Sequence, residues 1–174
     1  PIMCQHCENA PCEPVCPVYA SYHNSEGLNV QVYNRCVGTR YCANACPYIV
    51  RFFNYWDPVW PESLRNHLNP DVTIRSRGIM EKCSFCIQRI NRTSRKAKSE
   101  GRELEDGEIQ TACSAACGTH GIVFGDLNDP DSRVSKLKNN KRAFTLLEQF
   151  GTDPNVIYLA KVDPHKKGSE EGHH

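Results

Sequence analysis

Cysteine is the residue type in this chain whose number and spacing could carry chemistry. The sequence of 174 residues contains 11 cysteines. They fall into three groups along the chain: Cys4, Cys7, Cys12 and Cys16; then Cys36, Cys42 and Cys46; then Cys83, Cys86, Cys113 and Cys117. Closely spaced cysteines build disulfide frameworks, zinc sites and iron–sulfur centres, so these three chemistries compete.

The first two groups form an internal repeat, because each ends in Cys-x3-Cys-Pro, at Pro17 and at Pro47. Bacterial ferredoxins bind clusters with a Cys-x2-Cys-x2-Cys-x3-Cys-Pro run, whose fourth cysteine ligates the other cluster. Disulfides fit poorly, since the number of cysteines is odd. Zinc stays open for the third group, whose Cys83-x2-Cys86 pair and distant second pair match the spacing of a zinc ribbon. The repeat favours iron–sulfur clusters.

Cross-ligation between the repeats predicts which cysteines share a cluster. It assigns one [4Fe-4S] cluster to Cys4, Cys7, Cys12 and Cys46. The reciprocal set has only three cysteines, namely Cys16, Cys36 and Cys42. Thr39 stands where the ferredoxin run would have the missing one. We therefore expect a [3Fe-4S] cluster beside Thr39, the alternative being a [4Fe-4S] cluster with one iron held by water or by the Thr39 hydroxyl.

The third group is incomplete by the same rule. Cys83, Cys86 and Cys113 can hold a further [4Fe-4S] cluster only with a fourth ligand, and Cys117 needs a set of partners of its own. We therefore expect another cysteine motif outside these residues, upstream in the same polypeptide.

Aromatic residues crowd the segment 52–60, between the second and third cysteine groups. We expect these rings to shield the clusters from water and to fill the small core, because aromatic side chains bury large apolar areas. The alternative is a surface for docking a partner, where Tyr and Trp are enriched. Exposure of the rings distinguishes the two interpretations.

The other segments predict short elements. The basic stretch 89–102 predicts an exposed helix that ends near Gly101, and the acidic residues after it favour a solvated face over nucleic-acid binding. Segment 141–150 predicts a short amphipathic helix. Short strands are predicted at three apolar runs: 72–74, 122–124 and 156–159. No nucleophile elbow, phosphate loop or carboxylate pair is present, so the sequence predicts no catalytic site.

Composition is that of an ordinary globular domain, with 39% hydrophobic residues and a net charge of +1. No stretch approaches the roughly 18 consecutive apolar residues of a spanning helix, so we predict no membrane span. We expect one cluster-binding domain over residues 1–162, followed by a solvated tail at 163–174. Within it we distinguish four parts: an inner cluster pair at 1–50, a connector at 51–81, an outer motif at 82–125 and a C-terminal wrap at 126–162.

Four runs carry a resemblance to a known family: Cys4-Gln-His-Cys7-Glu-Asn-Ala-Pro-Cys12-Glu-Pro-Val-Cys16-Pro17, Asn34-Arg35-Cys36-Val-Gly-Thr39-Arg-Tyr-Cys42, Lys82-Cys83-Ser-Phe-Cys86 and Phe124-Gly-Asp-Leu-Asn-Asp-Pro130. Together they resemble the four-cluster, ferredoxin-like electron-transfer subunits of the molybdopterin oxidoreductase superfamily. Within that superfamily, Thr39 in place of a cysteine is similar to the iron–sulfur subunit of bacterial alternative complex III.

The resemblance implies an α+β fold of tandem bacterial-ferredoxin type with loop insertions. It implies a subunit with no catalytic site of its own, which relays single electrons through [4Fe-4S] clusters and one [3Fe-4S] cluster in a quinol-oxidising respiratory complex. The expected partners are a molybdopterin-type domain, quinone-binding membrane subunits and multihaem cytochrome c, on the periplasmic face of a bacterial inner membrane.

Two other functions remain open. One is an electron-transfer subunit of a molybdopterin reductase for polysulfide, tetrathionate, nitrite or dimethyl sulfoxide, and the other is a zinc-binding structural module.

Overall fold

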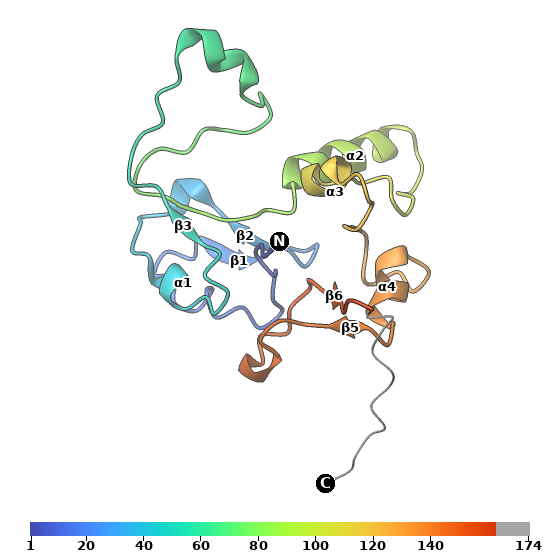
Figure 1. Ribbon diagram of the computed structural model, residues 1–174. Coiled ribbons are helices and arrows are strands. Elements are labelled where there is room, and N and C mark those ends of the chain that lie inside the picture. Colours follow the sequence, from blue (N-terminus) through green and yellow to red (C-terminus); the bar gives the residue numbers. More distant parts are fainter. Residues whose placement is uncertain (163–174) are drawn as a thin grey trace.

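The computed structural model describes residues 1–162 as short helices and small sheets joined by long loops (Figure 1). Within these residues, three antiparallel sheets of two strands each pair β1 (Ser21–His23) with β2 (Asn29–Gln31), β3 (Phe52–Phe53) with β4 (Met80–Glu81), and β5 (Ala143–Phe144) with β6 (Tyr158–Leu159). The α-helices are α1 (Tyr41–Asn44), α2 (Ile87–Ser99), α3 (Ala112–Ala116) and α4 (Arg133–Lys138). Short 3₁₀ helices lie at η1 (Tyr33–Arg35), η2 (Glu62–His67) and η3 (Glu148–Phe150). This mixture confirms the α+β class.

The core is small and consists largely of cysteines. Its buried members are Cys7, Ala10, Cys12, Cys42 and Met80, with Cys36, Ala43, Tyr48 and Phe53 packed against them. Small domains that cannot bury a sizeable aliphatic core are commonly stapled by metals or disulfides. Cysteines of the first two groups thus form a large part of this core, as expected of a domain stabilised by bound metal.

The β1–β2 hairpin follows from local turn chemistry. Asn24 Oδ1 accepts hydrogen bonds from the backbone amides of Glu26 and Leu28, at 3.1 and 2.8 Å. Gly27 supplies the left-handed backbone at φ +77°, as Asx turns with glycine commonly do. Because side chains alternate along a strand, Ser21, Asn29 and Gln31 share one face of this hairpin in the observed register.

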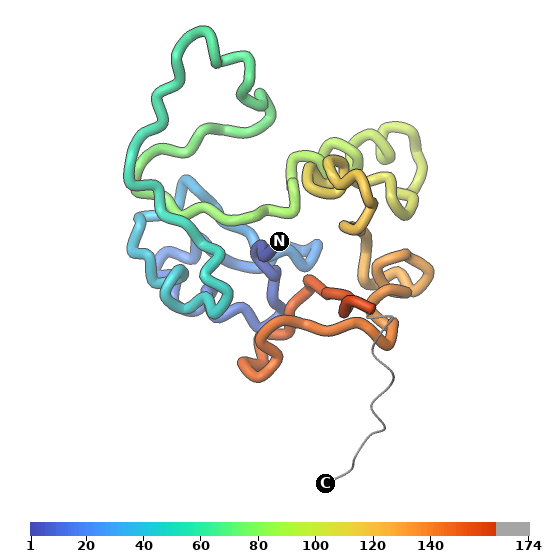
Figure 2. Tube along the Cα trace, in the orientation of Figure 1, coloured from blue at the N-terminus to red at the C-terminus, as the bar shows by residue number. Residues whose placement is uncertain are grey.

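The connector is a loop closed at its base by backbone hydrogen bonds (Figure 2). Gly78 N donates to Asn54 O at 2.8 Å, and Asn54 N donates to Ile79 O at 2.9 Å, so the residues between them project from the body. Trp56 is 71% exposed and Val59 is 90% exposed. Phe53 packs against the cysteine core, whereas Phe52, Tyr55 and Trp60 are exposed like Trp56. The expectation that these rings fill the core is therefore confirmed for Phe53 and wrong for the others. The predicted strand at 72–74 is also wrong, since this part of the connector has no ladder partner among the residues described.

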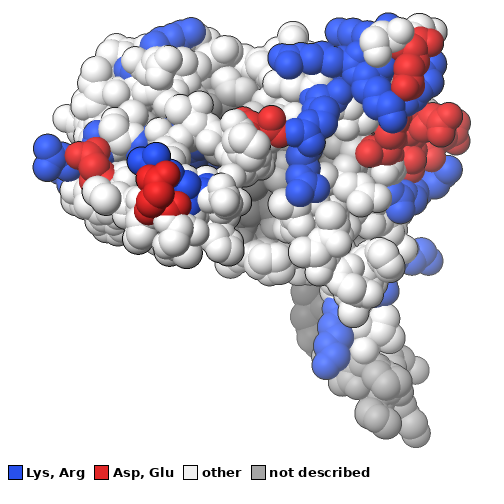
Figure 3. Space-filling view, turned by 90° about the horizontal axis from the view of Figure 1, so that it is seen from above, with Lys and Arg blue, Asp and Glu red and all other residues white. Residues whose placement is uncertain are grey.

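The predicted basic helix is confirmed as α2, which buries Ile90 and Ala97 and leaves its charged face in solvent. The helix ends at Ser99, and Gly101 follows with φ +68°. Lys and Arg side chains adjoin acidic ones on the side of the molecule that carries α2 (Figure 3). Arg102, for example, pairs with both Glu100 and Glu108, at 2.7 and 2.5 Å.

The helix predicted at 141–150 is wrong. Its first half forms β5, whose Ala143 and Phe144 pair with Leu159 and Tyr158 of β6. Leu147 then takes a left-handed conformation at φ +55°, which interrupts any α-helix before η3. The strand predicted at 156–159 is confirmed only for its last two residues, as β6, and residues 122–124 form no strand. The predicted tail at 163–174 lies outside the described residues.

The C-terminal wrap returns to the first cysteine group. Glu8 N donates to Asp153 O at 2.9 Å, and Asn155 N donates to Gln5 O at 2.9 Å. Tyr48, after the second repeat, contacts the Thr152 hydroxyl at 2.6 Å. Nothing in the described chain forms a helix long and apolar enough to cross a membrane.

Candidate metal centre

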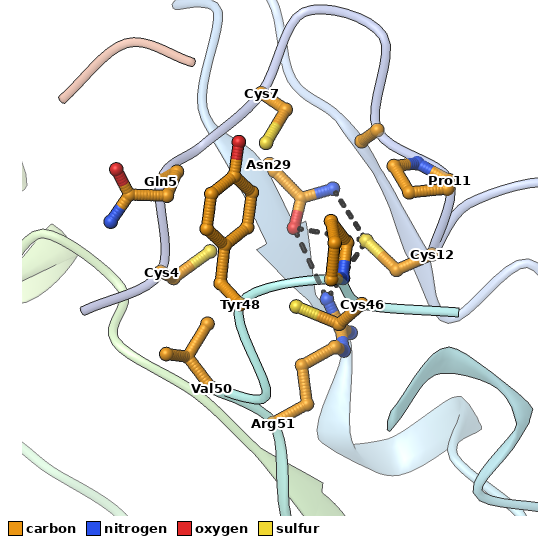
Figure 4. A pocket seen from close by; sticks show the side chains of 12 residues that line it. Cys4, Gln5, Cys7, Pro11, Cys12, Asn29, Cys46, Tyr48, Val50 and Arg51 are labelled. Carbon is orange, nitrogen blue, oxygen red and sulfur yellow. Dashed lines mark hydrogen bonds between the residues drawn. The ribbon is translucent and has the colours of Figure 1, made fainter. Parts of the chain in front are cut away.

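Four cysteines from the two repeats line one cavity (Figure 4). They are Cys4, Cys7, Cys12 and Cys46, the four that cross-ligation assigns to one cluster. Their sulfur atoms point toward a common space in Figure 4, and the apolar side chains of Ala10, Pro11 and Val50 complete its walls. The structure thus brings together thiols from two distant parts of the sequence.

The turn between Cys4 and Cys7 depends on a buried histidine. His6 has φ +45°, a left-handed backbone that turns the chain between the two cysteines. Its ring stacks on Phe85 at 3.7 Å, and its Nε2 donates to the carbonyl oxygen of Cys83 at 3.1 Å. Burial, with the nearby Lys82 charge, lowers the pKa of His6 to about 2. The ring is therefore neutral, and it joins the first cysteine group to the third.

Two buried cations face the sulfur atoms. Arg51 Nη1 donates to Cys12 Sγ at 3.1 Å, and Lys82 Nζ donates to Cys4 Sγ at 3.4 Å. Lys82 also contacts the carbonyl oxygens of Asn29 and Cys83. Charge-assisted donors of this kind stabilise anionic acceptors. The cavity is therefore arranged to hold negative charge.

The thiols themselves are biased toward the neutral form. Burial raises the pKa of Cys7 to about 11, although a hydrogen bond with Thr152 opposes this shift. Burial also raises the pKa of Cys12, against the opposing effect of Arg51. A thiolate in such a site needs cationic partners beyond the protein. Iron provides them, so the donor set fits a metal–sulfur cluster.

Two of the three cysteines assigned to the second cluster, Cys36 and Cys42, lie in the same core as Cys7 and Cys12. Cys36 Sγ accepts a hydrogen bond from Met80 N at 3.4 Å, and Cys42 belongs to the same core around Met80. Cys16 Sγ accepts from Ala20 N at 3.2 Å. Burial alone would raise the pKa of Cys16, but backbone amides that donate to its sulfur lower it. Cys36 and Cys42 therefore share one core.

Thr39 lies at the edge of this second set, in an exposed position just before α1. It lines an open cavity together with Arg40, Arg51, Phe53 and Tyr55. Gly38, beside it, has φ +73°. No thiol from the described residues lines this cavity, so it is not the space between Cys16, Cys36 and Cys42. The assignment of Thr39 to the second cluster stays a prediction from the cysteine spacing.

The third group is only partly assembled. Cys86 Sγ accepts from Ala112 N at 3.3 Å, and the Thr111 hydroxyl contacts Cys113 Sγ at 3.1 Å, so these two cysteines are neighbours. Cys117 lies beyond α3, where Gly121 N donates to its sulfur at 3.3 Å. Hydrogen bonds from Thr119 and nearby amides lower the pKa of Cys117.

A single-ion site has no counterpart in residues 1–162. No three His, Cys, Asp or Glu side chains there are arranged to hold one metal ion. A structural zinc ion needs four ligands at roughly 2.0 to 2.3 Å from one centre. The zinc interpretation therefore rests on cysteine spacing alone.

Comparison with known proteins identifies the cofactor class. A family model described as a 4Fe-4S dicluster domain matches residues 1–60, which contain both repeats. The chain is 48% identical over 165 residues to the iron–sulfur cluster-binding subunit of a menaquinone reductase from Nitratidesulfovibrio vulgaris, covering 92% of this chain and 65% of that protein. It is 39% identical over 161 residues to iron–sulfur subunit 1 of an Hdr-like menaquinol oxidoreductase from Archaeoglobus fulgidus, covering 91% and 55%.

A third relative decides the family. The iron–sulfur subunit of an arsenate respiratory reductase from Shewanella sp. is 32% identical over an alignment of 187 residues, gaps included, which covers 91% of this chain and 74% of that protein. The chain belongs to the family of 4Fe-4S dicluster iron–sulfur subunits. It spans 65% and 55% of the length of the first two relatives. The prediction of iron–sulfur chemistry from the repeat is confirmed at the level of the 4Fe-4S class.

The residues of this iron–sulfur subunit fit the cofactor in a second respect. Arg51 Nε is buried and has no hydrogen-bond partner among the residues described, although the side chain lines both cavities. Buried donors are normally paired. A cluster in the cavity lined by Cys4, Cys7, Cys12 and Cys46 presents sulfide and thiolate acceptors, which suit such a donor.

Sequence reasoning missed the buried polar residues around the cysteines. No role beside the cysteines was predicted for Arg51 or Lys82, because arginine and lysine side chains are usually exposed. Their proximity to cysteines was the available signal: Lys82 immediately precedes Cys83. Ser21 and Asn29 carried no comparable signal, since only the hairpin register brings them to Cys12.

Proposed function

We propose that this subunit relays single electrons through a series of adjoining clusters. In this proposal a [4Fe-4S] cluster is held by Cys4, Cys7, Cys12 and Cys46, and a [3Fe-4S] cluster by Cys16, Cys36 and Cys42. The contiguity of the three cysteine groups carries the proposal. Arg51 lies beside Cys12 and Cys42. Lys82 donates to Cys4 and immediately precedes Cys83 of the third group.

The cluster types follow from the donor sets. Four thiols line the first cavity, which supplies one thiolate for each iron of a cubane. Thr39 stands in the sequence where the ferredoxin run has its remaining cysteine, and its hydroxyl is a much weaker iron ligand than a thiolate. This arrangement supports a [3Fe-4S] cluster there. The alternative keeps a fourth iron bound to water or to Thr39.

The third group extends the relay. Cys83, Cys86 and Cys113 serve as ligands of a further [4Fe-4S] cluster, and Cys117 ligates another. Cys113 is exposed, as a ligand would be at a surface that a further cysteine motif covers. We place that motif elsewhere in the same protein, in keeping with the greater length of the relatives.

The complex we propose is a membrane-associated, quinol-oxidising respiratory complex of the alternative complex III type. Thr39 supports this assignment, and two relatives are named for menaquinone or menaquinol chemistry. The partners in this assignment are a molybdopterin-type domain, quinone-binding membrane subunits and multihaem cytochrome c, on the periplasmic face of the membrane. The arsenate reductase relative supports the second candidate, an electron-transfer subunit of a molybdopterin reductase.

Low-temperature EPR of the purified complex tests the proposal, first as oxidised and then after reduction with dithionite. An oxidised [3Fe-4S] cluster is paramagnetic, whereas oxidised low-potential [4Fe-4S] clusters are silent until reduced. We expect a signal before reduction that is joined by others afterwards. Signals only after reduction would favour the reductase alternative with [4Fe-4S] clusters throughout. Zinc without iron or acid-labile sulfide would overturn the relay itself.

A further inference from the structure

Arg51 is buried between the two cysteine sets. It is 5% exposed and lines both cavities, the one around Cys12 and the open one beside Thr39. Its Nη1 donates to Cys12 Sγ at 3.1 Å, and Cys42 lies beside the same guanidinium. One fixed charge therefore lies beside a cysteine of each proposed cluster, Cys12 of the first and Cys42 of the second.

Neutral partners hold the guanidinium in place. Nη2 donates to Ser21 Oγ at 3.0 Å and to Gln31 Oε1, and Nη1 donates to Asn29 Oδ1 at 3.3 Å. None of the ion pairs in residues 1–162 includes Arg51. A buried charge is costly unless it is paired. The compensating negative charge must come from the thiolates and the clusters that they hold.

We propose that Arg51 is a positioning residue that raises the reduction potentials of two adjacent clusters together. Reduction adds one electron to a cluster and makes the cluster with its thiolates more negative, while no bond forms or breaks. The guanidinium stays protonated in proteins, so it stabilises the reduced state of either cluster without taking up or releasing a proton. An electron that moves between the two clusters remains close to the same cation. This inference rests on the proposed cluster ligation.

The test is a redox titration of the purified complex, followed by EPR, with Arg51→Gln as the main variant. We expect the reduction equilibrium constants of both clusters to fall by tenfold or more, which corresponds to at least about 59 mV for one electron. Arg51→Lys keeps the charge and should keep most of the wild-type potential. Arg35→Gln is the matched control, because Arg35 adjoins Cys36 but is exposed and donates to Tyr19 O at 3.0 Å. Its potentials should stay at wild-type values.

A second variant, Gln31→Glu, allows the inference to be tested even if Arg51→Gln fails to bind its clusters. Gln31→Glu keeps Arg51 and places a carboxylate on its Nη2, so both potentials should fall by less than in Arg51→Gln. Potentials unchanged in Gln31→Glu and in any loaded Arg51→Gln would overturn the inference, as would a shift confined to one cluster. A wild-type complex without iron and sulfide would instead overturn the proposed function.

Discussion

A Cβ atom at Gly38 would overlap the backbone carbonyl oxygen of Gly78 and would lie 3.0 Å from the Phe53 ring. This approach fixes the loop between Cys36 and Cys42 against the base of the connector. Gly38 also has φ +73°, where side chains other than glycine are strained. The position of Cys36 and Cys42 therefore depends on the close approach of Gly38 to Gly78.

We expect Gly38→Ala to destabilise the protein and to loosen the second cluster. The left-handed backbone contributes about 1–2 kcal/mol, and the overlap adds about 1–3 kcal/mol by overpacking. Gly27→Ala is the matched control, because Gly27 has φ +77° but nothing within 4 Å of its Cβ position. The loss of visible cluster absorbance on heating should begin at a lower temperature in Gly38→Ala than in Gly27→Ala. Equal behaviour would mean that the contact with Gly78 is unimportant.

Thr39→Cys should convert the second cluster from [3Fe-4S] to [4Fe-4S]. The new thiolate would stand where the ferredoxin run has its cysteine, and it would supply the ligand that a fourth iron needs. We expect the EPR signal of the oxidised complex to disappear and a new signal to appear on reduction, at a lower potential. Thr39→Ser, which adds no thiol, is the control and should keep the oxidised signal. An unchanged spectrum in Thr39→Cys would contradict the assignment of Thr39 to this cluster.

The sequence predicted which four cysteines line one cavity better than it predicted the elements around them. The repeated Cys-x3-Cys-Pro ending was enough to place Cys46 with the first group, because ligation by cysteine constrains spacing directly. Residues 141–150 were predicted as a helix from their apolar period, yet β6 pairs with Ala143 and Phe144. Tertiary pairing overrides local propensity in such short segments. The hairpin contacts of Arg51 depend on register across distant residues, which no local pattern encodes.

Two substitutions in the segment between the second and third cysteine groups should differ in their effect on stability. Trp56 is 71% exposed and Met80 is 1% exposed, although both belong to the segment between the second and third cysteine groups. We expect Trp56→Ala to change the stability of the loaded protein by no more than about 0.5 kcal/mol. Met80→Ala should cost about 2–5 kcal/mol, because it opens a cavity in the cysteine core. Thermal unfolding followed by circular dichroism compares the two variants. A large loss in Trp56→Ala would restore the interpretation in which these rings fill the core.

Single cysteine substitutions test cross-ligation most directly. Cys4→Ala and Cys46→Ala alter different repeats, but both sulfur atoms line the same cavity. They should therefore produce the same spectral change, loss or conversion of one [4Fe-4S] signal, while the signal of the wild-type [3Fe-4S] cluster persists. Cys16→Ala belongs to the first repeat by sequence and should instead disturb the [3Fe-4S] signal. If each repeat held its own cluster, Cys4→Ala would match Cys16→Ala, and Cys46→Ala would match Cys42→Ala. EPR of these four variants, with iron and sulfide content measured on the same samples, distinguishes the two arrangements.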